Sequence, residues 1–147
     1  MEDLAVVQAR WRLGILPPAS LPEVARRALA DGEDGPALRA LAELRDPARS
    51  EVASLFEDAL DEAGRRPMGL EEAGRLVAGD LATKVLSGEL SPGEGARRIA
   101  WDVWDRCRTL EHLGIFVTLM ERWEAEHEHR EVIEEAILRE ARRILLG

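Results

Sequence analysis

Cysteine, tyrosine and lysine are almost absent from this sequence of 147 residues, which contains one cysteine, Cys107, no tyrosine and one lysine, Lys84. A single cysteine excludes an intramolecular disulfide and a zinc site built on cysteines, so we expect a protein of a reducing compartment, the cytoplasm. The first residues are acidic and contain no long apolar run, which fits neither a signal peptide nor a membrane span. We therefore expect no membrane association.

The sequence also lacks the two-residue alternation and the β-branched and aromatic clusters that are typical of strands. Apolar residues instead recur three and four positions apart in nearly every segment. This pattern predicts an all-α fold, an irregular bundle of about seven to eight helices. We expect one domain, 1–147, with a short-helix half at about 1–64 and a long-helix half at about 69–147. The segment near 110–125 is apolar nearly all round, which predicts the central helix.

Serine and proline mark the expected helix starts. Ser91 and Pro92 are followed by Glu94, which combines an N-cap, a first-turn proline and a carboxylate three residues beyond the cap. Ser20 and Glu23 have the spacing of a capping box as well. Further starts are expected at Asp34-Gly35-Pro36 and Asp46-Pro47. The expected helices lie at about 2–13, 20–30, 36–44, 47–63, 70–86, 91–107, 110–125 and 128–146.

Acidic residues outnumber basic ones by 29 to 20, which gives a formal net charge of −9. This charge repels the phosphates of nucleic acids and of anionic membranes, so we expect neither as a partner. The acids gather on the outer sides of the helices expected at 47–63 and 128–146. An acidic face complements a cationic one, and we predict a protein-interaction module, an immunity-like or regulatory binder of a cationic protein. The residues concerned at 47–63 include Glu51, Glu57, Asp58, Asp61 and Glu62.

Tryptophan is the most frequent aromatic residue, with four copies against two phenylalanines. Trp101 lies one helical step off its helix's apolar stripe, on the side of Arg97 and Arg98. It either forms an interface with these arginines or covers the edge of the core. The same alternatives apply to Trp11. Together with the apolar residues after it, Trp11 forms an apolar helix end that could dock on the bundle or on a second copy of the chain. A homodimer is therefore a further hypothesis.

A histidine-rich segment, 124–129, contains the Glu-x-x-His spacing of di-iron helices twice. A second such helix is missing, since Thr109 stands three residues before the remaining histidine, His112. We therefore favour a solvated helix junction here. The alternative is a small metal-binding or enzymatic bundle centred on Glu124, His127 and His129, with His112 as a further ligand.

Other chemistries find little support. Gly93-Glu94-Gly95 resembles the start of a dinucleotide-binding loop, but no strand precedes it and Arg98 replaces the third glycine. Cys107 lies on an apolar stripe and is expected to be a small buried residue rather than a nucleophile. A helix-turn-helix that binds DNA through Arg97 and Arg98 is a further alternative, opposed by nearby acids and the net charge. We predict no catalytic residues and no cofactor, and we lean against an enzyme.

The stretch Ser87–Ile99, together with Trp123-Glu124, resembles a family of small bacterial all-helical proteins without an established activity. The resemblance implies a stand-alone bacterial helical domain and transfers no function. The chain is also similar in type to immunity and antitoxin proteins, which bind and neutralise a partner.

Overall fold

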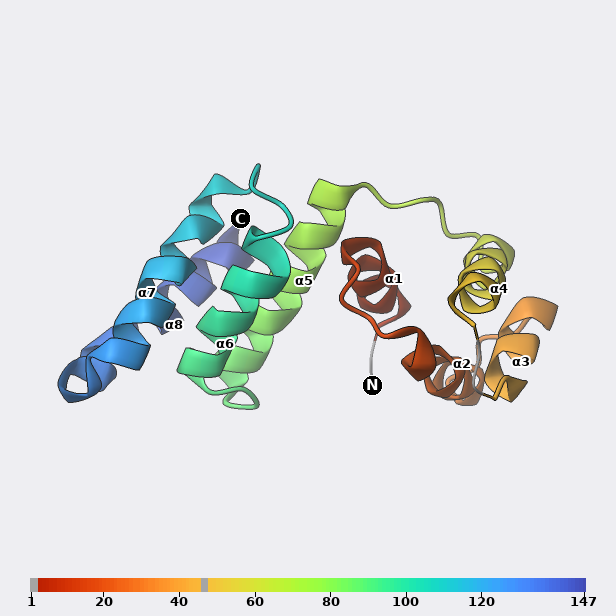
Figure 1. The fold of residues 1–147 in the computed structure, drawn as a ribbon, viewed down its shortest axis with the longest axis horizontal. Helices are drawn as coiled ribbons and strands as arrows, with labels where there is room; N and C mark the ends of the chain where they lie inside the picture. The colour runs from red at the N-terminus through yellow and green to blue at the C-terminus, as the bar shows by residue number, and fades with distance from the viewer. Residues whose placement is uncertain (1–2, 46–47) are drawn as a thin grey trace. The chain divides into compact units, whose positions relative to one another are not determined.

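The computed structural model describes residues 3–45 and 48–147, and these residues contain eight α-helices and no strand (Figure 1). The prediction of an all-α bundle of seven to eight helices is confirmed. The chain divides into two compact units: a larger unit of Met1–Ile15 and Met68–Gly147, and a smaller unit of Leu16–Pro67. Among the described helices, none has the length and apolar composition that a membrane span requires.

The smaller unit contains a 3-10 turn, Pro18–Ser20, and three helices: α2 (Leu21–Ala30), α3 (Pro36–Glu43) and α4 (Arg49–Glu62). Helix α3 packs against both α2 and α4. Spacings of three and four residues recur among the buried side chains of each helix, so each helix contributes one apolar stripe to a shared core. The buried side chains are Leu21, Pro22, Ala25, Ala37, Leu38, Leu41, Val52, Phe56, Ala59 and Leu60.

The starts of these helices follow the sequence signals in part. Helix α3 begins at Pro36, as predicted. The predicted capping box at Ser20 and Glu23 does not form, because Ser20 has helical backbone dihedrals (φ −82°, ψ −17°) instead of the extended conformation of a capping serine. Its hydroxyl makes no capping hydrogen bond and donates to the carbonyl of Pro17, at 2.6 Å, within the preceding 3-10 turn. The signal at Asp46-Pro47 lies outside the described residues.

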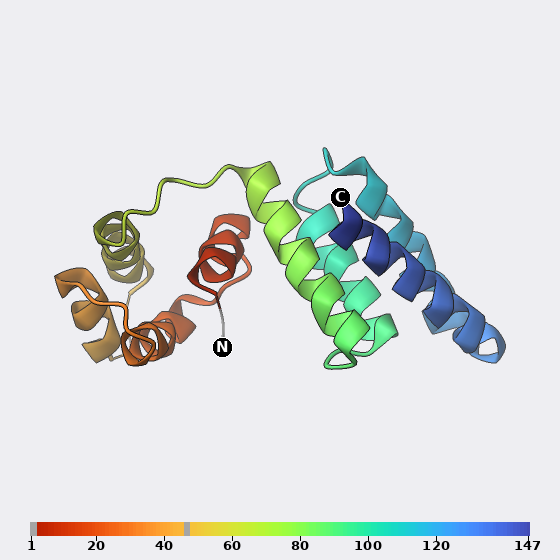
Figure 2. The same cartoon turned by 180° about the vertical axis from the view of Figure 1, so that it is seen from behind.

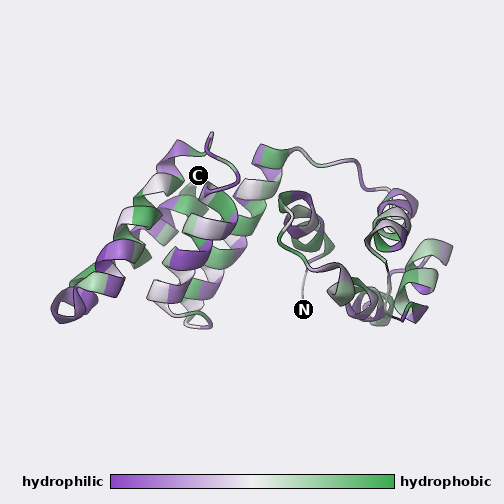
Figure 3. Cartoon of the chain, viewed as in Figure 1, coloured by the Kyte–Doolittle hydropathy of each residue, from purple (hydrophilic) through white to green (hydrophobic). Residues whose placement is uncertain are grey.

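The larger unit contains α1 (Leu4–Leu13), α5 (Leu70–Ser87), α6 (Pro92–Arg98), α7 (Ile115–Ala125) and α8 (Arg130–Leu146). Helix α6 continues into a π-helical segment, Ile99–Trp104, and short 3-10 turns at Glu111–Gly114 and His127–His129 precede α7 and α8. Each helix contains both hydrophilic and hydrophobic residues (Figure 3), as amphipathic helices require.

Helix α5 is the most enclosed helix of the larger unit. It packs against α1, α6 and α8, whereas the apolar helix α7 packs against α6 and α8. Small residues explain the difference, because they allow neighbouring backbones to approach on several sides. A β-carbon at Gly74, for example, would lie 2.8 Å from the Leu110 side chain. The buried residues of α5 are Ala73, Gly74, Val77, Ala78, Leu81, Ala82 and Val85.

Helix α6 begins as predicted, with the Ser91 hydroxyl accepting a hydrogen bond from the Glu94 N–H at 3.3 Å. Two glycines in this helix contact its neighbours closely. A β-carbon at Gly95 would lie 2.1 Å from Val85 of α5, and one at Gly93 would lie 2.4 Å from the indole ring of Trp123 on α7. Glycine is therefore a packing requirement at both positions.

Candidate functional site

The outer side of α4 carries a row of acidic side chains. Val52, Phe56 and Ala59 face the core of the smaller unit, and the residues on the other side of the helix are exposed. We define the α4 acidic face as the exposed carboxylates Glu51, Glu57, Asp58 and Asp61. From Glu51 to Asp61 the helix rises by about 15 Å. The face is therefore long enough to meet an extended surface on another protein.

No described basic side chain forms an ion pair with the α4 acidic face. Some other exposed acids do form ion pairs: Glu23, for example, pairs with Arg26 and Arg27 at 2.9 and 3.4 Å. Helix α4 also has no basic residue in its last turn. Asp58 and Asp61 thus lie near the end of the helix where the backbone carbonyls already concentrate negative charge. Repulsion between these carboxylates and the backbone carbonyls lowers the stability of the folded helix.

Glu62, which the sequence grouped with these acids, has a structural role. Its carboxylate accepts hydrogen bonds from the backbone N–H of Ala37, at 3.1 and 3.2 Å, and so caps the start of α3. Nearby, the pKa of Asp34 is held below its ordinary value because the carboxylate accepts a hydrogen bond from the Gly35 N–H and pairs with Arg39. These two acids stabilise the start of α3, so we leave Glu62 out of the α4 acidic face.

Trp101 is 51% exposed and lies in the π-helical segment that continues α6. Its carbonyl accepts a hydrogen bond from Arg106 at 2.7 Å. The two arginines on its side are not free, because Glu94 pairs with Arg97 at 3.7 Å and with Arg98 at 3.2 Å. Exposed tryptophan is typical of interfaces, so an interface role for Trp101 stays a prediction.

Trp11 is half-buried on α1. Helix α1 packs on α5, and Ile15 packs against the core of the larger unit. The apolar end of α1 is thus partly covered by its own unit. A dimer through Trp11 stays a prediction.

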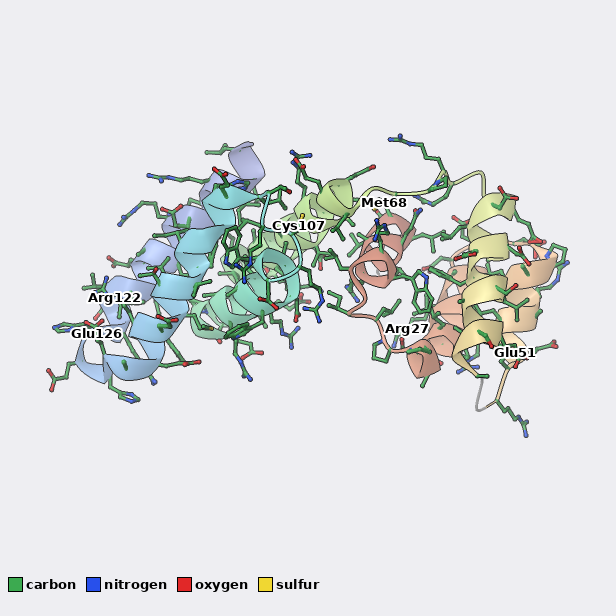
Figure 4. The ribbon with its side chains drawn as sticks, turned by 45° about the horizontal axis from the view of Figure 1, so that its top comes forward. Arg27, Glu51, Met68, Cys107, Arg122 and Glu126 are labelled. Atoms are coloured by element: carbon green, nitrogen blue, oxygen red, sulfur yellow. The ribbon has the colours of Figure 1, made fainter. Side chains whose placement is uncertain are left out.

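The segment 124–129 forms a solvated junction between α7 and α8, shown as hydrophilic in Figure 3. Helix α7 ends at Ala125, and after Glu126 the residues His127–His129 form an exposed 3-10 turn. The Glu126 carboxylate accepts from Arg122 at 2.8 Å and lies 3.3 Å from Nδ1 of His129 (Figure 4). The Arg122 hydrogen bond lowers the pKa of Glu126, with a smaller contribution from His129, and the same pair raises the pKa of Arg122.

The structure does not gather the predicted metal ligands. Among the described residues, no three His, Cys, Asp or Glu side chains form a group that could hold a metal ion. His112 precedes α7 whereas His127 follows it, so the 11 residues of this helix separate them, a rise of about 16 Å. Glu124 lies in the last turn of α7, whereas His127 and His129 lie in the 3-10 turn that follows it.

His112 lines a surface cavity of about 320 Å³ that the sequence does not reveal. Its wall also contains Glu140 and Arg143 of α8, which pair at 3.2 Å. The remaining lining residues are the apolar Ile115, Phe116 and Ile144. Residues so far apart in sequence meet only through the packing of α8 beside α7, and no local motif marks them. The charged pair in the wall is satisfied internally.

Cys107 is buried, as predicted for a small core residue. Its sulfur lies 3.8 Å from the carbonyl of Leu70 and 3.7 Å from the Thr109 hydroxyl. The residue is 3% exposed, so the structure offers no accessible nucleophile at this position.

Comparison with known proteins found no matching family model, no matching curated protein and no matching solved structure. The resemblance of Ser87–Ile99 and Trp123-Glu124 to a bacterial helical family stays a prediction. The structure does place these two stretches in contact, through Gly93 and Trp123. The α4 acidic face gathers exposed carboxylates without a described basic partner on one side of a single helix.

Proposed function

We propose that the protein is an interaction module that binds a cationic surface of another protein through the α4 acidic face. The observation that carries this proposal is the set of exposed carboxylates on α4 for which the described residues supply no basic partner. A binder of this kind is immunity-like or regulatory, because its action is to cover a site on the partner. The proposal assigns the protein no reaction of its own.

The cost of the acidic face to folding supports this proposal. Negative charge at the C-terminal end of a helix opposes the macrodipole, and neighbouring carboxylates repel one another. Residues that break such local rules without an internal compensation are expected at functional sites. A cationic partner would supply the missing compensation, and it would associate faster because opposite charges steer the encounter.

The test compares two variants that remove the same number of charges. The first, E57Q/D58N/D61N, neutralises most of the α4 acidic face. The matched control, E89Q/E111Q/E121Q, neutralises exposed carboxylates outside α4 that form no recorded ion pair. Each is used with the wild type to capture partners from a lysate of the source cell at about 0.15 M salt. Captured proteins are identified by mass spectrometry, and the dissociation constant is then measured by calorimetry with the purified partner.

We expect the α4 variant to lose about tenfold or more in affinity, while the control stays within about threefold of the wild type. The partner should carry a basic patch, and its binding should weaken as salt rises. Equal binding by the α4 variant and the wild type would contradict the proposal. Equal losses in both variants would contradict it as well, since only net charge would then matter.

A further inference from the structure

Helix α8 presents an outward face that no other element of the larger unit covers (Figure 2). Ile133, Ile137 and Ala141 are buried against the unit. The opposite side is exposed along the whole helix and carries both charged and apolar side chains. We define the α8 outer face as the exposed residues Glu131, Val132, Glu135, Arg139, Arg142, Leu145 and Leu146, together with Leu138 at its edge, which is half-buried and also packs against the core.

The charges on this face are separated along the helix. Glu131 and Glu135 lie in its first half, and Arg139 and Arg142 lie in its second half. None of these four forms a recorded ion pair, although Arg143, next to Arg142, pairs with Glu140. The face is therefore acidic at one end and basic at the other, with its charges available to an external partner.

Exposed apolar side chains accompany these charges. Val132 is 64% exposed at the start of the helix, and Leu145 and Leu146 are 48% and 87% exposed at its end. Leu138 lies midway between them. Five residues of this face form one row along the helix: Glu131, Glu135, Leu138, Arg142 and Leu145. They are separated by four and three residues in turn, which is the spacing of contact residues in paired helices.

We infer that the α8 outer face binds the same face of a second copy of this chain, with the two helices antiparallel. An antiparallel pair centred between Leu138 and Arg139 brings Glu135 of one copy opposite Arg142 of the other, twice by symmetry. The acidic half of each helix then meets the basic half of its partner. In a parallel pair, each charge would instead face the identical charge on the other copy, which is repulsive.

A second copy matches this face better than a partner of one charge sign. A cationic partner complements only the first half of α8, and an anionic partner complements only the second half. Each copy carries a net charge of −9, but repulsion between charges beyond about 8 Å is screened at physiological salt. Attraction between the opposite charges of two α8 outer faces can then outweigh the repulsion between the net charges of the two copies.

The interface is expected to be weak because it involves one helix from each copy. The 17 residues of α8 span about 25 Å, which limits the buried area to the lower range of specific interfaces. We expect a dissociation constant on the order of 100 µM. This inference concerns a different helix from the α4 acidic face and does not depend on the function proposed for it.

The test is sedimentation equilibrium of the full chain at about 0.15 M salt, up to a concentration of about 1 mM. The wild type should form dimers. R142E places a carboxylate opposite Glu135 at both symmetric positions, and it should weaken the dimer by about tenfold or more. The double variant E135R/R142E exchanges the two charges and should restore the affinity to within about threefold of the wild type.

R45E is the matched control, because it makes the same charge change at an exposed arginine outside α8 that, like Arg142, has no ion pair among the described residues. It should leave the dimer constant within about twofold. Circular dichroism of each variant checks that its helices are intact. A wild type that stays monomeric, a dimer that R142E does not weaken, or a double variant that stays as weak as R142E would each overturn the inference. The α4 acidic face is unchanged in all these variants, so this result and the partner-binding result are separate.

Discussion

The indole ring of Trp123 lies directly against Gly93, where an added β-carbon would be only 2.4 Å from the ring. On the ring itself, the guanidinium of Arg130 lies 4.0 Å from the ring centroid, and the indole N–H donates to Glu134 at 3.0 Å. One aromatic side chain of α7 thus contacts both α6 and α8. Because the arginine and the glutamate hold the ring, it has little freedom to move away from a larger residue at position 93.

Gly93→Ala should therefore destabilise the larger unit. The added methyl group overlaps a rigid ring, and overpacking of this kind costs about 1–3 kcal/mol. All four tryptophans lie in the larger unit, so urea unfolding followed by tryptophan fluorescence reports on this unit. Gly79→Ala is the matched control, since a β-carbon there has nothing within 4 Å. It should stabilise the same unit, by up to about 1 kcal/mol. A loss of stability in both variants would show that the contact with Trp123 is not the difference between these positions.

Neighbouring acids at the end of α4 should respond to substitution in opposite directions. Glu62→Ala removes the carboxylate that caps the start of α3, which should cost about 1 kcal/mol of local stability. The hydrogen-exchange protection of the Ala37 amide should then fall about fivefold. Asp61→Asn removes an exposed charge that disfavours the helix end and should leave this protection unchanged or higher. Hydrogen exchange followed by NMR resolves this amide. Equal loss in the two variants would contradict the division between a capping acid and the α4 acidic face.

Local signals in the sequence account for the helix starts that were predicted correctly. Ser91 and Pro92 suffice to begin α6, because the cap and the fixed proline dihedral act within a few residues. At Ser20 the same local reasoning failed, because the 3-10 turn at Pro18–Ser20 holds Ser20 in a helical instead of an extended backbone conformation. The spacing of a capping box predicts a cap only where the preceding chain leaves the serine extended.

The contacts between helices could not be predicted in the same way. The apolar stripe of α1 shows that one side is buried, but only the structure shows that this side meets α5, where Arg10 approaches Asp80 at 3.8 Å. The enclosed position of α5 depends on small residues such as Gly74, which a hydropathy pattern undervalues. Of the candidate site, the acidic side of α4 was visible in the sequence. The lack of described basic partners for it, and the different role of Glu62, required the structure.

Added metal should not stabilise the protein through the α7–α8 junction. His127 and His129 lie in an exposed turn, and the described residues bring no third ligand to them. A site of this kind lacks the three or four ligands that a tightly bound zinc ion requires. We expect the melting temperature at about tenfold excess zinc to match that of the protein without metal within about 1 °C. A zinc-dependent rise that disappears in H127A/H129A would establish the metal-binding alternative.

The ion pair between Arg122 and Glu126 should make the end of α7 sensitive to acid. Arg122 donates to the Glu126 carboxylate at 2.8 Å, and this hydrogen bond lowers the pKa of Glu126 in the folded protein. A carboxylate with a lowered pKa stabilises the fold above the pH at which the unfolded residue titrates. That stabilisation is lost as the pH falls from about 5 through the lowered value. Local hydrogen exchange at the junction should therefore accelerate over this interval.

Arg122→Gln removes the main cause of the shift, so the pKa of Glu126 should rise toward its ordinary value. NMR titration of the glutamate side-chain carboxyl carbons measures this pKa directly. Arg139→Gln is the control, because it removes the same charge from an exposed arginine of α8 that forms no recorded ion pair. It should leave the Glu126 titration unchanged. An equal rise in both variants would assign the shift to the overall charge of the protein, whereas a rise in R122Q alone assigns it to the hydrogen bond at the end of α7.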